Sequence, residues 1–236
     1  MTRRPFNFTM SRRELILGLA YLPIHTIALP FLISWHSARY PGMFTPVQYN
    51  VAYIAFSFAV VLAIALKYLR AEFDGLLNNK LLTVFTLIQG YFLNFLLNYI
   101  LLMLLLLIMG NTGLSNPNDA ALADMAAEDY RKVLGMAVFL GPIVEEVLFR
   151  GVVFGALLKR DRLAAYIVSI MLFALLHVWQ YAILEQNVSV LLYALDYLPV
   201  GFILAWCYER SGNLWTPILF HMGINATALA IMSFGS

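Results

Sequence analysis

Seven long apolar segments, separated by shorter polar ones, dominate the hydrophobic pattern of the chain. Each is long enough, at roughly 20 residues, for an α-helix to cross the hydrocarbon core of a bilayer. The segments cover residues 14–35, 49–66, 81–109, 133–158, 163–182, 188–208 and 214–234. The pattern therefore predicts an all-α, polytopic transmembrane helix bundle with about seven spans, or eight if one segment is divided.

A polar stretch at residues 110–129, rich in Asn, Asp, Gly and Ala, lies between the third and fourth apolar segments. It divides the chain into three predicted parts: three N-terminal transmembrane helices without a motif (1–110), an outer polar loop (111–131) and a core of four helices (132–234). The acidic side chains of the stretch are predicted to be solvated in that loop. They are Asp119, Asp124, Glu128 and Asp129.

The composition agrees with a membrane protein. The 236 residues are 62% hydrophobic and 12% charged, whereas a soluble domain has about twice that charged fraction. The net charge is only +2, and no basic stripe carries interleaved aromatic residues, so nucleic acid is excluded as an expected partner. The single cysteine, Cys207, lies in an apolar segment and provides neither a disulfide nor a cysteine-pair metal site.

Lysine and arginine are distributed unevenly between alternate polar segments. If the N-terminus is cytoplasmic, the inner segments hold Arg3, Arg4, Arg12, Arg13, Lys67, Arg70, Lys80, Lys159, Arg160, Arg162 and Arg210, and the outer segments hold Arg39, Arg131 and Lys132. Cytoplasmic loops of membrane proteins carry the excess of these residues. The N-terminus is therefore predicted to lie in the cytoplasm, and with seven spans the C-terminus lies outside.

Three charged residues interrupt the apolar segment 133–158, namely Glu145, Glu146 and Arg150. A charge at this depth is costly and is usually retained for function. In a helix, Glu146 and Arg150 are four residues apart and share a face, so the arginine can neutralise that carboxylate. Glu145 points about 100° away, and desolvation is expected to raise its pKa toward the range of a general base. The alternative is a charge-paired contact that only locks the bundle together.

Gly141 and Pro142 lie one turn before the carboxylates. Proline within a span leaves a backbone carbonyl without its hydrogen bond, which lipid tolerates only next to a cavity or another helix. A cavity that holds water at this point would accommodate both the proline and Glu145.

Two histidines lie within the last four apolar segments. These are His177 and His221, and Asn225 shares a helical face with His221 because it is four residues further on. Thr216 and Pro217 are typical of an N-cap and a first helical residue. Counted along the helices, Glu145 and His177 lie at similar depths, but His221 is about 10 Å shallower. The depths meet if the turn at residues 212–213 dips into the membrane or if the helices tilt, and the difference suggests a pocket that opens to the cytoplasm.

Other polar residues within apolar segments have no predicted catalytic role. Asp196 is predicted to line the pocket or to bind a neighbouring helix. His25 and His36 are predicted to be structural.

In these residues the chain resembles the CPBP family, which comprises the CAAX proteases and bacteriocin-processing enzymes and is also called Abi. The family pattern is EExxxR on one span, FxxxH on the next and HxxxN on a later one. The matching residues, in order, are Glu145, Glu146 and Arg150, then Phe173 and His177, then His221 and Asn225. The resemblance covers residues 132–234.

The resemblance implies an intramembrane endopeptidase. Glu145, helped by His177, would activate a water molecule that attacks a peptide carbonyl. His221 and Asn225 would stabilise the resulting oxyanion. The substrate would be a membrane-associated peptide or protein, with either a CAAX-type C-terminus or a leader or signalling peptide. The short loops are typical of a prokaryotic member, which favours the cytoplasmic membrane of a prokaryote.

The resemblance also implies that Glu146 and Arg150 organise the site. The family is described both as zinc metalloproteases and as metal-free glutamate peptidases. The chain has no HExxH motif, but Glu146, His177 and His221 would supply three zinc ligands. The metal-free mechanism, without a cofactor, is the favoured hypothesis.

Two alternatives belong to other classes. A non-enzymatic immunity or partner-binding membrane protein would retain the pocket without turnover. A proton-coupled transporter would use buried Glu, Asp and His residues as a relay, but it predicts an internal repeat symmetry that the sequence does not have.

Overall fold

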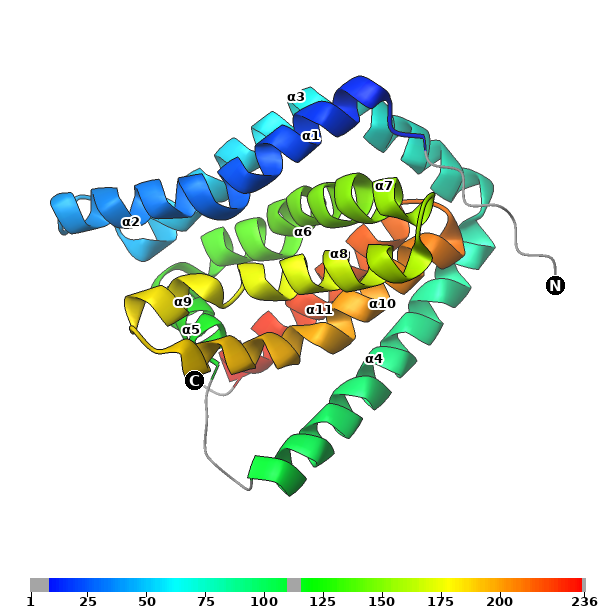
Figure 1. Cartoon of the computed structure of the whole chain (residues 1–236). Helices are drawn as coiled ribbons and strands as arrows, with labels where there is room; N and C mark the ends of the chain where they lie inside the picture. Colours follow the sequence, from blue (N-terminus) through cyan, green and yellow to red (C-terminus); the bar gives the residue numbers. More distant parts are fainter. Residues whose placement is uncertain (1–8, 110–115, 235–236) are drawn as a thin grey trace.

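Helices make up almost all of residues 9–109 and 116–234, the part of the chain that the computed structural model describes, and no β-strand occurs in that part (Figure 1). In chain order the elements are α1 (Arg12–Pro23), η1 (Ile24–Ala28), α2 (Leu29–Arg39), α3 (Pro46–Asn78), α4 (Lys80–Met109), α5 (Pro117–Val133), η2 (Leu134–Leu140), α6 (Gly141–Glu145), η3 (Glu146–Phe154), α7 (Gly155–Leu158), α8 (Arg162–Leu176), α9 (Trp179–Leu184), η4 (Val188–Asp196), α10 (Tyr197–Ser211) and α11 (Trp215–Phe234). Segments η1 to η3 are π-helical, and η4 is a 3-10 helix. The all-α prediction is confirmed.

Five helical stretches in the described part are long and apolar enough to cross a membrane, rather than seven. They are Arg12–Arg39, Pro46–Asn78, Lys80–Ile108, Val188–Ser211 and Trp215–Ser233. The predicted segment 133–158 is helical throughout, but its three charges exclude it from this set. The predicted segment 163–182 is not one helix, because α8 ends at Leu176 after about 22 Å. The first residues of the predicted outer loop, 111–115, lie outside the described residues.

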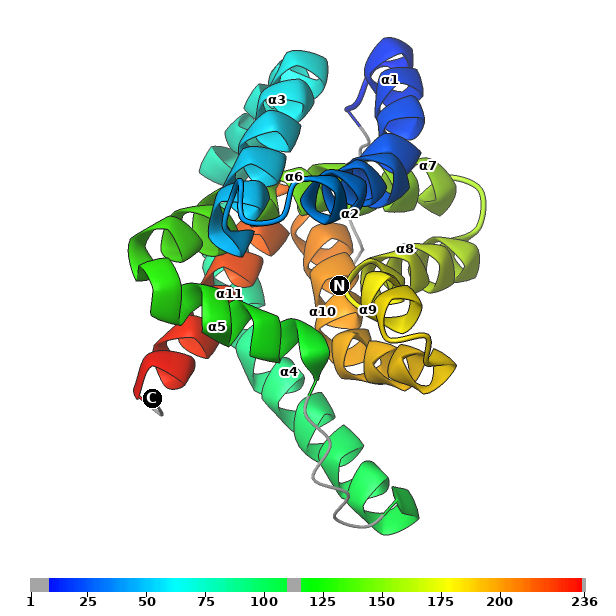
Figure 2. The ribbon, with the colours of Figure 1, turned by 90° about the vertical axis from the view of Figure 1, so that its left-hand side faces the viewer.

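The elements that carry the sequence motifs (α6 with η3, α8 and α11) pack around α10, which carries none of the motifs. Helix α8 lies against η3 and α10, and α10 also packs on α11. Helices α1 and α3 cover the run from α6 to α7 on one side, and α4 crosses α10 and α11 on the other (Figures 1 and 2). This arrangement buries Phe149, Phe173, Leu204 and Phe220 in one apolar cluster.

Two helix turns fix the position of α11. Gly212 ends α10 because it adopts a left-handed conformation. Its N–H still bonds to the carbonyl of Tyr208, four residues back. The Asn213 side chain then accepts the N–H and the hydroxyl of Thr216 at 2.9 and 3.0 Å, so Asn213 caps the helix. The prediction of a cap at Thr216 is therefore wrong by a few residues. Asn213 is fully buried, so the cap of α11 lies inside the protein.

A buried carboxylate, Glu14, ties α1 to α3. Helix α3 is kinked at Ala65, whose backbone is not helical. The N–H of Tyr68, one turn later, donates instead to Oε1 of Glu14 at 3.0 Å. The other oxygen of Glu14 accepts the N–H of Ser11 at 2.8 Å. Glu14 thus satisfies a donor left by the kink and has a partner for each oxygen.

A second buried carboxylate, Glu72, ties α3 to the start of α11. Its Oε2 accepts the N–H of Leu214 at 2.7 Å, and its Oε1 accepts the hydroxyl of Thr9 at 2.6 Å. Helix N-termini favour negative charge because their first N–H groups have no partner within the helix. Glu72 therefore serves as a cap supplied by another helix.

Candidate active site

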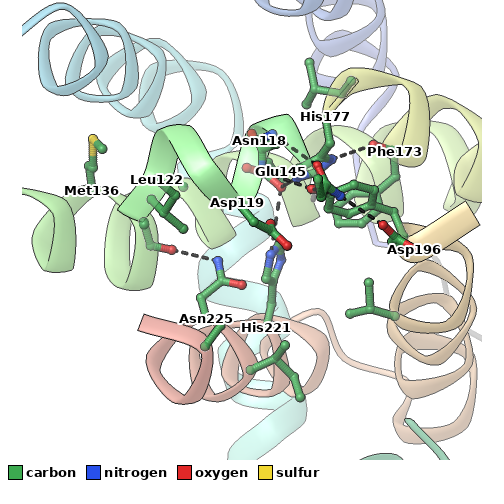
Figure 3. Close-up of a pocket in the computed structure, with 18 of the residues that line it drawn as sticks. Asn118, Asp119, Leu122, Met136, Glu145, Phe173, His177, Asp196, His221 and Asn225 are labelled. Atoms are coloured by element: carbon green, nitrogen blue, oxygen red, sulfur yellow. Dashed lines mark hydrogen bonds and ion pairs between the residues drawn. The ribbon is translucent and has the colours of Figure 1, made fainter. Parts of the chain in front are cut away.

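A cavity of about 730 Å³, here called the chamber, lies between α5, α6, the end of α8, the start of α10 and α11 (Figure 3). Glu145, His177, His221 and Asn225 all line it. Three separate helical runs contribute these side chains, as the sequence predicted. The structure thus brings the predicted site residues together.

Proline creates the local geometry ahead of the carboxylates. Segment η2 is π-helical, with the N–H of Gly141 bonded to the carbonyl of Met136, five residues back. Pro142 has no N–H, so in this register the carbonyl of Ala137 is left without a helical partner. Asn225 donates to that carbonyl at 2.8 Å. The free carbonyl that the proline predicted thus exists, and it orients the Asn225 amide.

Glu146 and Arg150 form a fully buried ion pair one turn apart on η3. The Nη1 of Arg150 donates to Oε1 of Glu146 at 3.1 Å, and both side chains have no exposed surface. Nη2 of Arg150 donates to the carbonyl of Gly201 at 3.1 Å, and the guanidinium lies 4.4 Å above the Phe173 ring. The predicted pairing is confirmed, and Arg150 also joins η3 to α10.

His221 is held by the same carboxylate. Its Nδ1 lies 2.9 Å from Oε1 of Glu146, the oxygen that already accepts from Arg150. An accepting carboxylate oxygen requires a hydrogen on the imidazole nitrogen. The neutral ring therefore has Nδ1–H, and its Nε2 has no hydrogen.

His177 sits where α8 breaks. Residue 177 caps the helix, and Val178 departs from helical geometry. The Nδ1 of His177 lies 2.8 Å from the carbonyl of Phe173, and because a carbonyl can only accept, this nitrogen also carries the hydrogen. Tyr197 stacks on the ring at 4.3 Å. In the neutral form, Nε2 of His177 thus has no hydrogen either.

Glu145 faces both of these acceptor nitrogens. Its Oε2 lies 3.9 Å from Nε2 of His177 and 3.9 Å from Nε2 of His221. This oxygen is buried and has no hydrogen-bond partner. Buried polar atoms are nearly always hydrogen-bonded, and the spacing is that of groups bridged by a water molecule. The site is therefore built around a position for a small polar molecule.

The predicted zinc alternative does not fit these positions. That alternative needs Glu146 as a zinc ligand together with His177 and His221. In the structure, Glu146 bonds to Arg150 and to Nδ1 of His221, whereas His177 faces Glu145. Ligand atoms of a tetrahedral zinc site lie about 3.3 Å apart, whereas Oε2 of Glu145 lies 3.9 Å from Nε2 of each histidine. No group of three His, Cys, Asp or Glu side chains among the described residues has the spacing of a metal site.

Helix α5 adds polar residues that the sequence did not single out. Asn118 donates to the hydroxyl of Tyr197 at 3.0 Å, and Asn116 donates to Asp196 at 3.1 Å. Asp119 also hydrogen-bonds to Tyr197. Desolvation raises the pKa of the Asp119 carboxyl, whereas His177 and the hydrogen bond to Tyr197 act to lower it. Asp119 is exposed, as predicted for the polar stretch, and both Asp119 and Asp196 line the chamber. In the sequence, only the Asn and Asp content of residues 116–119 indicated that this segment contributes polar side chains to the chamber.

Two predictions about orientation are incompatible. The chamber is lined from the end of the bundle that holds α5, α9 and the last turns of α11. The basic turns at residues 159–162 and 210–213 lie at the opposite end (Figure 1). A cytoplasmic N-terminus therefore excludes a chamber that opens to the cytoplasm.

Comparisons with known proteins match the part of the chain that contains these residues. Residues 130–227 match the family model described as type II CAAX prenyl endopeptidase Rce1-like. The chain is 33% identical over 94 residues, 39% of its length, to "Putative membrane peptidase YdiL" of Bacillus subtilis (strain 168), and spans about a third, 34%, of that relative. It is 28% identical over 174 residues to "UPF0177 protein YxdF" of Lactococcus lactis subsp. lactis (strain IL1403), covering 70% of this chain and 84% of that protein. No solved structure matches the chain.

The matched residues 130–227 contain all three sequence motifs and every residue of the buried carboxylate and imidazole cluster. Residues 130–227 are thus similar to the Rce1-like type II CAAX prenyl endopeptidases, and the two relatives are consistent with this similarity.

Proposed function

We propose that the protein is an intramembrane endopeptidase that hydrolyses a membrane-associated peptide with water activated by Glu145. One observation carries the proposal. A buried carboxylate oxygen without a hydrogen-bond partner faces two imidazole nitrogens, 3.9 Å from each. The family match and the peptidase name of the Bacillus relative support the same reaction class.

Water fits the gap between these three atoms. A molecule about 2.8 Å from Oε2 of Glu145 and from one of the two imidazole nitrogens would donate one hydrogen to each of them. A lone pair of its oxygen is then directed away from the cluster, toward the chamber. Glu145 accepts the proton as the oxygen attacks a peptide carbonyl carbon. The proton passes to the leaving nitrogen when the C–N bond breaks, which regenerates the carboxylate.

Asn225 and His221 are suited to the tetrahedral intermediate. One amide hydrogen of Asn225 is committed to the Ala137 carbonyl, and this bond fixes the direction of the other. His221 donates from Nε2 only after it gains a second proton. The carboxylate of Glu146 lies 2.9 Å from the other nitrogen and balances the charge of the resulting cation. Preorganised donors of this kind stabilise an oxyanion in a dry pocket.

Arg150 and Glu146 are proposed as positioning residues. Arg150 lies too deep to reach the chamber, being fully buried between Glu146, Gly201 and Phe173. It fixes the carboxylate that orients His221. The proposed mechanism uses no metal and no cofactor.

Cleavage by the purified protein tests the proposal. A membrane-anchored leader-type peptide and a prenylated CAAX-type peptide would be offered to the wild type and to Glu145→Gln, His177→Ala and Glu146→Gln variants. We expect the wild type to cut one of them and Glu145→Gln to lose the activity. Full activity of Glu145→Gln would reject the assignment of the base. Partner affinity in all variants, with no cleavage by the wild type, would indicate a binding protein.

Treatment with a chelator distinguishes the metal-free mechanism from a zinc mechanism. The wild-type rate should survive treatment with a strong chelator and should not rise when zinc is restored. Loss of the rate on chelation and its recovery with zinc would contradict the metal-free mechanism.

A further inference from the structure

The Lys and Arg residues of the described chain are concentrated at one end of the bundle, here called the basic end. This end holds Arg12, Arg13, Lys67, Arg70, Lys80, Lys159, Arg160, Arg162 and Arg210. Contacts between distant segments show that these basic residues lie at the same end of the bundle. Thr9 and Leu214 both bond to Glu72, and Arg162 pairs with Glu209 at 2.7 Å. The turns after α3, α7 and α10 therefore emerge together.

The chamber lies toward the other end. It draws on α5 and α9 and on the last turns of α11, and its described lining includes no residue between 146 and 172 or between 201 and 220. Glu145 is 13 residues, about 20 Å of helix, from the last residue of α7 at the basic end. Only Arg39, Arg131 and Lys132 represent Lys and Arg at the chamber end of the described chain, and Lys132 is paired with Asp129 at 2.6 Å.

Short loops rich in Lys and Arg remain in the cytoplasm, and this bias sets the orientation of a membrane protein. The turns after α3, α7 and α10 are all short, which is the condition under which the rule applies. We infer that the basic end is cytoplasmic and that the chamber opens on the opposite, extracytoplasmic side of the membrane.

The substrate class follows from this orientation, and this step rests on the proposed function. A substrate reaches the chamber as an exported peptide or as the extracytoplasmic flank of a membrane-anchored protein. A prenylated C-terminus in the cytoplasm does not reach it. The described lining of the chamber also contains carboxylates, among them Asp119 and Asp196, but no Lys or Arg that would pair with a terminal carboxylate. An internal peptide bond of an exported segment is therefore the expected target.

Cysteine labelling in intact cells tests the orientation without any assay of activity. The wild type serves as the blank because Cys207, its only cysteine, is fully buried. Ser189→Cys places a thiol at the exposed start of η4, at the chamber end, and Asn78→Cys places one at the exposed last residue of α3, at the basic end. Neither substitution changes the charge. Both variants are treated with a membrane-impermeant maleimide before and after lysis, and label is expressed relative to the denatured protein.

We expect Ser189→Cys to be labelled fully in intact cells, and Asn78→Cys to be labelled only after lysis. The reverse result, or labelling of both variants in intact cells, would overturn the inference. Sided vesicles then test the substrate: right-side-out and inverted vesicles receive the same impermeant peptide that the purified enzyme cleaves. Cleavage only by right-side-out vesicles is expected, and cleavage only by inverted ones contradicts the assignment of the substrate. A purified protein that cuts no peptide defeats the proposed function, while the labelling result still decides the orientation.

Discussion

Two pairs of buried carboxylates occupy the same bundle and differ in how their oxygens are bonded. At the basic end, both oxygens of Glu14 and both oxygens of Glu72 accept a hydrogen bond, and each residue has at least one partner on a distant segment. At the chamber, Glu145 and Glu146 each retain one buried oxygen without a hydrogen-bond partner. Burial alone therefore does not mark a catalytic carboxylate in this protein.

The difference has a physical origin. Glu14 and Glu72 accept backbone N–H groups that a kink in α3 and the start of α11 leave free. These hydrogen bonds join one helix to another. Glu145 joins nothing, and its environment of two acceptor nitrogens is unfavourable unless a hydrogen-bearing molecule lies between them. The first pair is suited to stability and the second to chemistry, and substitutions can separate these two roles.

Among the substitutions at residues other than Glu145, the largest effect is expected from His177→Ala. Loss of the imidazole removes one acceptor for the water molecule, so the cleavage rate should fall about 10²- to 10⁴-fold. His36 is the matched control, because it bonds to Tyr49 and does not line the chamber. His36→Ala should leave the rate per folded molecule unchanged. A comparable loss of rate in both variants would remove the distinction between the chamber and the rest of the bundle.

Arg150→Met should chiefly destabilise the fold. It leaves the buried carboxylate of Glu146 without its counter-ion, and breaking such a pair costs about 3–5 kcal/mol of unfolding free energy. Adding Glu146→Gln to the variant should restore part of the loss, because the unpaired charge is then removed as well. Denaturant unfolding in detergent measures both. Additive losses would show that the two side chains are not coupled.

Asn225→Ala should affect both properties. An oxyanion donor contributes about 10²- to 10³-fold to the rate, and the Ala137 carbonyl would also lose its partner. Substrate KM should change much less than kcat, since the donor acts on the transition state. A rise in KM at constant kcat would instead assign Asn225 to substrate binding.

Glu72→Gln should have the smallest effect, and on stability only. The amide presents hydrogens to Thr9 or to the Leu214 N–H, so one donor loses its acceptor at a cost of about 1–3 kcal/mol. The rate per folded molecule should remain that of the wild type. A large loss of rate without a loss of stability would place Glu72 in the catalytic machinery.

Local patterns in the sequence predicted much of the site. Helical spacing paired Glu146 with Arg150, and the depth of each segment brought Glu145 and His177 together. The interrupted hydrogen-bond ladder before Pro142 was also predictable, because proline always lacks the donor. Each of these inferences depends on residues within one helix or on a count along it.

Contacts between distant segments were not predictable in the same way. No pattern near Glu72 indicates that it caps a helix that begins some 140 residues later. The break of α8 at His177 depends on the side chain bonding back to the Phe173 carbonyl, which a continuous apolar segment conceals. The position of α5 over the chamber, which brings the exposed Asp119 beside Tyr197, was also not predictable from the polarity of this segment. The direction in which the chamber opens also required the arrangement of all the helices.

The most direct test compares Glu145→Gln with Glu72→Gln, two substitutions of the same kind at opposite ends of the molecule. Single-turnover cleavage and the unfolding midpoint would be measured for both. The account predicts that Glu145→Gln slows cleavage about 10²- to 10⁴-fold with an unchanged midpoint, and that Glu72→Gln lowers the midpoint with an unchanged rate. An active Glu145→Gln variant, or one whose only defect is a lower midpoint, would contradict the claim that Glu145 activates the water.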